Sequence, residues 1–394
     1  MLRFREEFGD AITVGSASMK EFKKIHVFVP FLDKAEDSLI RDHYYYGGRV
    51  QCFQSGIIKG PFNVYDVNSM YPYVMSQFEH PISRPEISAS KRITEDTCFI
   101  SAEGYNNNAF PFRDENGSLR FNKEYGIFHV SIHEWKVAER YGLFKPTRIL
   151  QVVNFKHRRK FYKFVSHFYE SRKQANLDGD ATLALFYKYI LNSCSGKFSQ
   201  DSSQYFDYNI TDLNTWLQND ECENCRLEEC TEHWMHDETL LDHGIHIWKR
   251  RNPKPVYYNV ATGSSITGAA RAVLLEAIAN ADCPLYCDTD SLICKSIDNV
   301  NFSDTDLGAW KCEGSGKLAA IAGKKMYALF DKSRNLVEDS CIKMASKGVN
   351  LTAMQIFSLC QNPGSEINYQ KLSPTFHIDG SYSFLSRKAR MTAK

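Results

Sequence analysis

Tyr286-Cys287-Asp288-Thr289-Asp290-Ser291 places two carboxylates one residue apart at a turn, closely after the apolar segment 270–284. In a strand–turn–strand hairpin alternate side chains share a face, so we expect Asp288 and Asp290 to project toward one point. Such a pair suits Mg²⁺, a hard cation that takes oxygen ligands and substrate phosphates. Asp-x-Asp turns are common, however, so the hexapeptide by itself fits a turn without function equally well.

A second segment, Val64-Tyr65-Asp66-Val67-Asn68-Ser69-Met70-Tyr71-Pro72, carries a third carboxylate. It lies at the end of an apolar strand predicted over residues 60–66. A helix is predicted to follow, with Pro72 in its first turn, where proline is tolerated. The three aspartates of the two segments therefore stand at strand ends or turns, as solvated turn residues or as ligands.

Two further segments carry cations. Lys188-Tyr189-Ile190-Leu191-Asn192-Ser193-Cys194-Ser195-Gly196-Lys197 is predicted to be helical, which brings Lys188 and Asn192 to one face at i and i+4. Lys325-Met326-Tyr327 is predicted to lie on a strand after Gly323.

Taken in chain order, the segments 64–72, 188–197, 286–291 and 325–327 resemble motif A, motif B, motif C and the Lys-x-Tyr motif of family B DNA polymerases. The turn Tyr45-Tyr46-Gly47-Gly48 narrows the resemblance to the protein-primed branch of bacteriophages, adenoviruses and linear plasmids. The resemblance covers residues 40–394. It implies an α+β right-hand polymerase: a palm of antiparallel sheet plus helices, fingers made by a helical hairpin, a small thumb and two insertions.

The resemblance and the local patterns divide the chain into seven parts. These are an N-terminal segment with the Tyr-x-Gly-Gly turn (1–58), palm with motif A (59–80), a first insertion that faces the terminal protein and DNA (81–155), fingers (156–200), a Cys-rich second insertion (201–250), palm with motif C and Lys-x-Tyr (251–332) and thumb (333–394). Residues 1–40 are expected to be an entry segment rather than a domain. Helices are predicted over 158–176 and 181–197 in the fingers and over 267–280 in the palm.

The resemblance also assigns the catalytic roles. Asp66 and Asp290 match the family's two metal-binding aspartates, the carbonyl of Val67 is a further ligand, and Asp288 matches a neighbouring acid with a weaker, supporting role. Two Mg²⁺ ions, or Mn²⁺ as a substitute, would clamp the attacking 3′-oxygen and the leaving pyrophosphate.

Nucleotide contacts follow in the same way. Tyr71 matches the tyrosine that stacks under the incoming sugar and excludes a 2′-hydroxyl, although core packing is its plain alternative. Lys188 matches the lysine that grips the triphosphate. Arg172 is our choice for a second phosphate clamp, with Lys173 as the competitor.

The sequence departs from the family's usual pattern at one position in the fingers. Asn192 and Gly196 line the face over the nascent base pair, where glycine allows close approach. Ser195 stands where the family usually has tyrosine. A small hydroxyl there implies a more open nucleotide pocket, and it places fidelity and sugar selection in question.

The DNA contacts come from two motifs. Lys325 and Tyr327 match the pair that holds the primer terminus, the lysine on phosphate and the tyrosine beside the last base pair. Tyr45, Gly47 and Gly48 match the turn that contacts the template strand.

Bulk properties are those of an ordinary globular protein. The 394 residues carry a net charge of +1, with 43% hydrophobic and 24% charged residues. No apolar run is long enough for a membrane helix, and the charged start excludes a secretory signal. Cations mix with aromatics in Lys156-His157-Arg158-Arg159-Lys160-Phe161-Tyr162-Lys163, which suits nucleic acid but also a solvated helix face. The scattered cysteines favour a reducing, intracellular compartment: host cytoplasm, nucleus or mitochondrion.

One cysteine cluster leaves two interpretations open. Cys222-x2-Cys225-x4-Cys230-x2-His233-x2-His236 has knuckle-like spacing for structural Zn²⁺. It is one tight run without a distant second pair, so free thiols on a surface insertion fit as well.

The sequence therefore predicts a DNA-directed DNA polymerase that copies a viral or plasmid genome. Its expected partners are DNA template–primer, dNTPs and a terminal protein primer. No Asp-x-Glu occurs in residues 1–44, so no proofreading is expected within this chain, and an exonuclease would be a separate subunit. The alternatives are an inactive or dependent DNA-binding subunit of a split replicase, and another palm enzyme such as a reverse transcriptase.

Overall fold

The computed structural model divides into two compact units. One comprises residues 1–42, 82–84 and 166–264, and the other residues 43–81, 85–165 and 265–394; we call them the helical unit and the sheet unit. The structure describes residues 2–9, 13–26, 32–201, 206–212, 230, 232–237, 245–251, 259–376 and 382–392.

The helical unit contains most of the helices of the N-terminal and fingers segments. Its elements are α1 (Leu2–Phe8), α2 (Val14–Ile25), α3 (Lys34–His43), α6 (Tyr162–Leu177, from residue 166 on), α7 (Ala181–Phe198) and the three-stranded sheet of β11 (Phe206–Asp212), β13 (Ile245–Arg251) and β12 (Met235–Asp237). The predicted fingers helices are confirmed as α6 and α7, separated at Asp178-Gly179-Asp180. The Asp180 carboxylate caps α7 by accepting from the Leu183 amide at 3.0 Å.

The described part of residues 1–40 packs against the fingers helices. The Ser18 hydroxyl on α2 donates to the Ile190 carbonyl of α7, and the rings of Phe22 and Phe198 lie edge to face at 5.2 Å. On α1, Phe4 contacts Phe186 at 5.1 Å in the same geometry. These residues are therefore more than an entry segment, because they supply part of the hydrophobic core behind α7.

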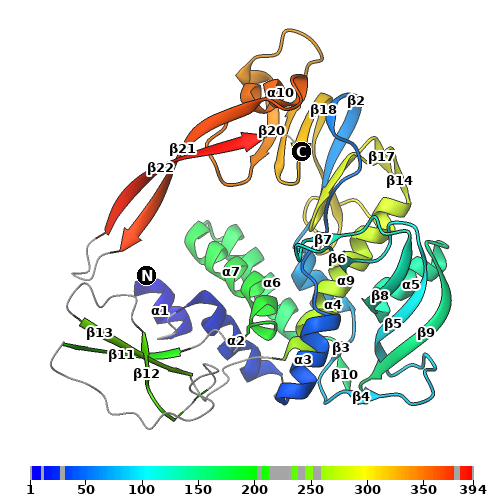
Figure 1. Cartoon of the computed structure of the whole chain (residues 1–394), viewed down its shortest axis with the longest axis vertical. Helices are drawn as coiled ribbons and strands as arrows, with labels where there is room; N and C mark the ends of the chain where they lie inside the picture. The colour runs from blue at the N-terminus through cyan, green and yellow to red at the C-terminus, as the bar shows by residue number, and fades with distance from the viewer. Residues whose placement is uncertain are drawn as a thin grey trace. The chain divides into compact units, whose positions relative to one another are not determined.

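A seven-stranded antiparallel sheet forms the centre of the sheet unit (Figure 1). Its strands, in spatial order, are β1 (Val50–Cys52), β15 (Tyr286–Asp288), β16 (Ser291–Cys294), β2 (Gly56–Val67), β18 (Trp310–Gly323), β19 (Met326–Phe330) and β20 (Cys341–Ser346). The strand predicted over 60–66 lies inside β2, the central strand of the sheet, whose second half is mostly buried. The sheet extends to residue 346, beyond the predicted palm boundary at 332.

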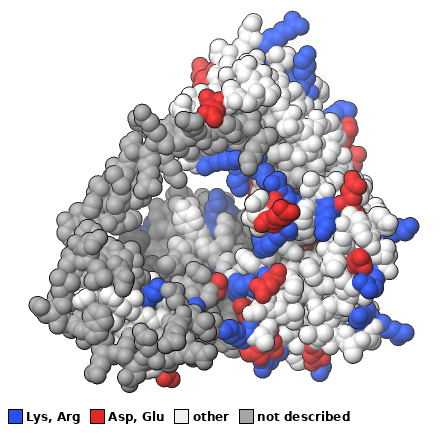
Figure 2. All heavy atoms as spheres, in the orientation of Figure 1, with Lys and Arg blue, Asp and Glu red and all other residues white. Residues whose placement is uncertain are grey.

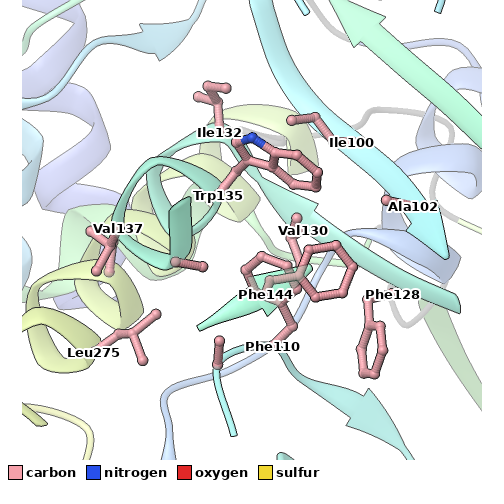
Figure 3. Close-up of a cluster of buried hydrophobic side chains, with 13 residues drawn as sticks. Ile100, Ala102, Phe110, Phe128, Val130, Ile132, Trp135, Val137, Phe144 and Leu275 are labelled. Atoms are coloured by element: carbon pink, nitrogen blue, oxygen red, sulfur yellow. The ribbon is translucent and has the colours of Figure 1, made fainter. Parts of the chain in front are cut away.

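A second sheet lies in the predicted first insertion. Its strands, in spatial order, are β4 (Glu86–Ile87), β9 (Phe144–Asn154), β5 (Thr97–Asn106) and β8 (Tyr125–Ser131). Helix α5 (Ile132–Arg140) covers one face of it (Figure 1). Phe110, Trp135 and Phe144 form the core beneath α5, and Leu275 adds to it from α9 (Val260–Ala279), as Figure 3 shows.

The remaining described elements are short or peripheral. They are α4 (Met70–Gln77), β3 (His80–Pro81), β6 (Phe112–Arg113), β7 (Leu119–Arg120), β10 (Arg158–Arg159), β14 (Ala281–Asp282), β17 (Ser296–Ile297), a 3₁₀ turn (Glu338–Ser340), α10 (Ala353–Gln361), β21 (Glu366–Phe376) and β22 (Tyr382–Thr392). In the predicted thumb, α10 packs on the central sheet through Ile356 and Leu359, and β21 pairs with β22.

Two predicted helix boundaries differ from the structure for identifiable reasons. The first fingers helix begins at Tyr162 instead of 158, because Arg158 and Arg159 pair with β3 and the Phe161 amide donates to the Met75 carbonyl. Helix α9 begins at Val260 instead of 267. Its first turns consist of small residues without an apolar period, and Gly263 there lies directly against Ser199.

None of the described helices is long and apolar enough to cross a membrane. In Figure 2 the basic and acidic side chains of the described residues are interspersed, in keeping with the net charge of +1.

His80 is a fully buried imidazole between α4 and α9. Its Nε2 lies 3.0 Å from the Val74 carbonyl oxygen, its Nδ1 lies 3.0 Å from the Ser265 hydroxyl, and its ring stacks on Phe161. Burial lowers the pKa of His80 to about 4. The folded protein therefore holds this histidine neutral at pH values where the unfolded chain protonates it.

Because of His80, the free energy of unfolding should decrease as the pH is lowered. The unfolded chain binds the extra proton below about pH 6.5, so the contribution is present above that pH and is lost as the pH falls toward 4. Between pH 7 and pH 5 we expect a loss of about 2 kcal/mol in the free energy of unfolding from this group. Urea unfolding at both pH values should show a smaller pH dependence for His80→Gln than for the unchanged protein. An equal pH dependence of the two proteins would contradict the assignment.

Candidate active site

The backbone brings Asp66 and Asp290 to one place in the sheet unit. Strand β2 ends beside the β15–β16 hairpin, with Asp66 opposite Ser291 across the antiparallel pair. The Val67 amide donates to the Asp290 carbonyl at 2.9 Å, so the end of β2 is fixed to the hairpin turn. Two carboxylates and the Val67 carbonyl, predicted from distant parts of the sequence, therefore lie at adjacent strand ends.

This donor set fits Mg²⁺. Among the described residues, no group of three or more His, Cys, Asp or Glu side chains is placed to hold a metal ion. Mg²⁺ is commonly bound by one or two carboxylates, with water and substrate phosphates as the remaining ligands. Asp66, Asp290 and the Val67 carbonyl provide such a partial shell.

Electrostatics at the hairpin favour a bound cation. Burial raises the pKa of Asp290, and the carboxylate of Asp288 adds to the rise. Glu313 raises it as well, whereas Lys343, which pairs with Glu313 at 2.5 Å, lowers it. A divalent cation beside Asp290 would return its carboxyl to the charged form.

Tyr71 lies close enough to Asp290 to experience its charge. It follows Ser69, whose left-handed backbone (φ 54°) turns the chain from β2 into α4, and its side chain is partly buried. Burial raises the pKa of Tyr71, and its hydroxyl also experiences the charges of Arg271 and Asp290. The structure therefore brings together Tyr71 and Asp290, which the sequence separates by more than 200 residues.

The Tyr-x-Gly-Gly turn is held by a buried ion pair that sequence reasoning missed. Arg271 on α9 donates to the carbonyls of Tyr46 (2.6 Å) and Gly47 (2.9 Å), and it pairs with Glu134 of α5 at 2.7 and 2.9 Å. Both charged side chains are at most 2% exposed. The available signal was a single cation, Arg271, in a helix rich in small and apolar residues, where a buried charge requires a partner.

The same turn is joined directly to motif C. The Thr289 amide donates to the Arg49 carbonyl at 2.7 Å. A Cβ on Gly48 would approach the Thr289 side chain to 2.8 Å, so this close contact requires glycine. Tyr45 is partly buried, and its carbonyl accepts from Arg113 at 3.0 Å.

One expectation about the lysine motif is wrong. Lys325 lies in the tight turn before β19, with a left-handed backbone (φ 56°), rather than on the strand. The Asp-x-Asp pair lies at the turn of a strand–turn–strand hairpin, as expected: Asp288 is the last residue of β15, and Thr289 and Asp290 form the two-residue turn. The hairpin needs a turn there because Asp288 pairs directly with Ser291.

The Asp288 carboxylate is paired with Lys325. The lysine Nζ lies 2.9 and 2.8 Å from the two carboxylate oxygens. Tyr327 is buried on β19 with its ring 4.9 Å from that of Tyr286. An open pocket of 770 Å³ adjoins this pair and is lined by Gly48, Val50, Ser118, Leu119, Asp288, Lys324, Lys325, Ala345, Ser346, Lys347 and Gly348.

The predicted fingers residues lie in the helical unit, on α7. Lys188, Asn192 and Gly196 are all exposed and recur every four residues, so they share one face as predicted. Nothing lies within 4 Å of a Cβ built on Gly196. Ser195 is buried beside this face, with its hydroxyl 3.4 Å from the Asn192 carbonyl.

The two candidates for a second phosphate clamp both lie on α6. Arg172 is partly buried and Lys173 is exposed, so exposure alone does not separate them. Of the zinc candidates, Cys222 and Cys225 lie outside the described residues. Cys230 is buried with its Sγ 3.4 Å from His233 Nδ1.

Comparison with known proteins decides the family. A family model described as DNA polymerase type B, organellar and viral, matches residues 3–283. The chain is 39% identical to the DNA-directed DNA polymerase of Enterobacteria phage PRD1, over 99% of this chain and 71% of that protein. The chain belongs to the type B DNA polymerases. The expected family B membership in its protein-primed branch is confirmed, and with it the enzyme class.

Solved structures of type B polymerases share the fold. Phi29 DNA polymerase in an orthorhombic crystal form matches 100% of this chain and 70% of its own, with 19% identity and a TM-score of 0.68. Its complex with primer–template DNA and incoming nucleotides matches with 18% identity and a TM-score of 0.67, over 100% of this chain and 70% of that one. The expected α+β right-hand polymerase fold is thereby confirmed.

The Arg271–Glu134 pair should behave as a buried ion pair in this polymerase. Glu134→Gln leaves the guanidinium without its carboxylate, and we expect a loss of about 3–5 kcal/mol in unfolding free energy. Replacing both partners, Arg271→Met with Glu134→Leu, removes the uncompensated charge and should recover part of that loss. Urea unfolding of the single and double variants tests this. A double variant at least as unstable as Glu134→Gln would contradict it.

Proposed function

We propose that this polymerase adds dNTPs to a primer 3′-hydroxyl on a DNA template by two-metal nucleotidyl transfer. The observation that carries the proposal is the hydrogen-bonded junction of β2 with the β15–β16 hairpin, which sets Asp66 and Asp290 side by side. Bound Mg²⁺ would activate the attacking oxygen and neutralise charge on the leaving pyrophosphate. Asp66, Asp290 and the Val67 carbonyl hold the ions, with Mn²⁺ as a substitute.

Five residues are assigned to the nucleotide in this proposal. Lys188 contacts the triphosphate, supported by its exposed position on α7, and Arg172 serves as the second clamp. Asn192 and Gly196 lie over the nascent base pair. Tyr71 lies beneath the sugar, supported by its proximity to Asp290.

DNA is held by the sheet unit. Lys325 binds a primer phosphate and Tyr327 supports the terminal base pair, next to a pocket that three lysines line. Tyr45, Gly47 and Gly48 contact the template strand, on a turn held in place by Arg271.

We further infer that a terminal protein supplies the priming hydroxyl and that the enzyme acts inside the host cell on a viral or plasmid genome. The Tyr-x-Gly-Gly turn and the separate sheet of residues 86–154 support the first inference. Zinc in the Cys-rich insertion and the absence of proofreading from residues 1–44 stay predictions of the sequence.

Primer extension tests the catalytic assignment. With a labelled DNA primer–template, dNTPs and Mg²⁺, Asp66→Asn and Asp290→Asn should each lose at least about 100-fold in rate, because each removes a ligand that stabilises transition-state charge. Glu139→Gln, an exposed acid on α5, is the matched control and should extend normally. DNA binding without extension by the unchanged protein would instead favour the DNA-binding subunit of a split replicase.

Sugar selection tests the role of Tyr71. Tyr71→Val removes the ring proposed to exclude a 2′-hydroxyl, so the ratio of dNTP to rNTP incorporation efficiency should fall by about tenfold or more. Single-nucleotide insertion with each nucleotide measures this ratio. Tyr73→Phe is the control: it lies two residues further along α4, keeps its ring and should leave the ratio unchanged. An unaltered ratio in Tyr71→Val would return Tyr71 to a packing role.

A further inference from the structure

The Asp288 carboxylate has four hydrogen-bonding contacts, which occupy both of its oxygens. Lys325 Nζ contacts both oxygens, the Tyr286 hydroxyl donates to Oδ2 at 3.2 Å, and the Thr289 hydroxyl donates to Oδ1 at 3.1 Å. Asp288 is 19% exposed and its lysine partner 56%. A largely occupied carboxylate has little remaining capacity for a cation.

Tyr286 fixes the other end of the same lysine. Its hydroxyl accepts from the Lys325 backbone amide at 3.0 Å while it donates to Asp288. The Tyr286 ring is fully buried, so this bridge is rigid. Both the backbone and the ammonium of Lys325 are therefore oriented from strand β15.

The pair opens onto the lysine-lined pocket. Asp288, Lys324, Lys325 and Lys347 line it, whereas Asp66 and Asp290 do not. Lys324 is engaged with the Leu119 carbonyl at 2.7 Å, and the Lys347 backbone amide donates to the Lys325 carbonyl at 2.8 Å. With three cations and one carboxylate, the pocket suits an anionic ligand such as a phosphodiester.

We propose that Asp288 is a positioning residue for Lys325 in primer binding, and not a ligand of the catalytic metal. This inference rests on the proposed function, in which Lys325 binds primer phosphate. An ammonium has three donors, and two of them point to Asp288. Because two N–H donors of the ammonium are held by Asp288, the direction of the third N–H is fixed as well. The flexible lysine side chain is therefore already ordered before the primer binds.

Charge and orientation make opposite predictions for Asp288→Asn. If only charge mattered, removal of the carboxylate would make the pocket more positive and primer–template binding tighter. If Asp288 orients Lys325, the same change weakens productive binding. The direction of the change in KM for primer–template therefore separates the two.

The experiment is a double-mutant cycle in single-nucleotide extension with the full chain. Asp288→Asn should raise KM for primer–template about tenfold, and adding it to Lys325→Ala should cause no further loss, because the two residues act as one unit. The Mg²⁺ concentration for half-maximal rate should be unchanged in Asp288→Asn. Asp290→Asn is the comparison for loss of a metal ligand.

A second variant covers the case in which Asp288→Asn folds poorly. Tyr286→Phe keeps the buried ring but removes the bridging hydroxyl, and it should raise the same KM by a smaller factor with the Mg²⁺ requirement unchanged. A higher Mg²⁺ requirement in Asp288→Asn, additive losses with Lys325→Ala, or tighter primer–template binding would each overturn the proposal. Absence of extension by the unchanged protein would instead overturn the proposed function.

Discussion

The antiparallel pairing of β2 with β16 is the constraint on which the catalytic arrangement depends. It is continued by the hydrogen bond from the Val67 amide to the Asp290 carbonyl, which fixes two strand ends against each other. Since β2 also pairs with β18 along most of its length, it has little freedom to shift. A slip by one residue would turn Asp66 to the opposite face of the sheet.

A buried ion pair extends this order to the Tyr-x-Gly-Gly turn. Arg271 and Glu134 come from α9 and from the first insertion, and together they hold the carbonyls of Tyr46 and Gly47. Gly48 then packs on Thr289 of the catalytic hairpin. Helix α5 is thus linked through this turn to the β15–β16 hairpin, because a buried charge must stay paired.

Asp288 and Lys325 illustrate the limits of sequence reasoning at the same hairpin. The Asp-x-Asp spacing predicts two acids with one target, but in the structure Asp288 ends β15 and its carboxylate is paired with Lys325, whereas Asp290 lies in the turn itself. Asp290 remains at the junction with β2, and Asp288 faces a lysine located 37 residues further along the chain. Spacing alone does not reveal this, because it depends on where the hairpin turns and on which strand ends nearby.

Local patterns by themselves determined the strand that carries Asp66, the helices α6 and α7 and the face shared by Lys188 and Asn192, and the family was indicated by the resemblance of the four motifs. These features follow from residue periodicity and from motif spacing, which are short-range properties. Tertiary structure alone decided the Arg271–Glu134 pair, the Lys325 turn and the packing of α1 and α2 on α7. Each of these depends on a contact between distant segments, and burial of charge or apolar surface selects that contact only once the whole chain has folded.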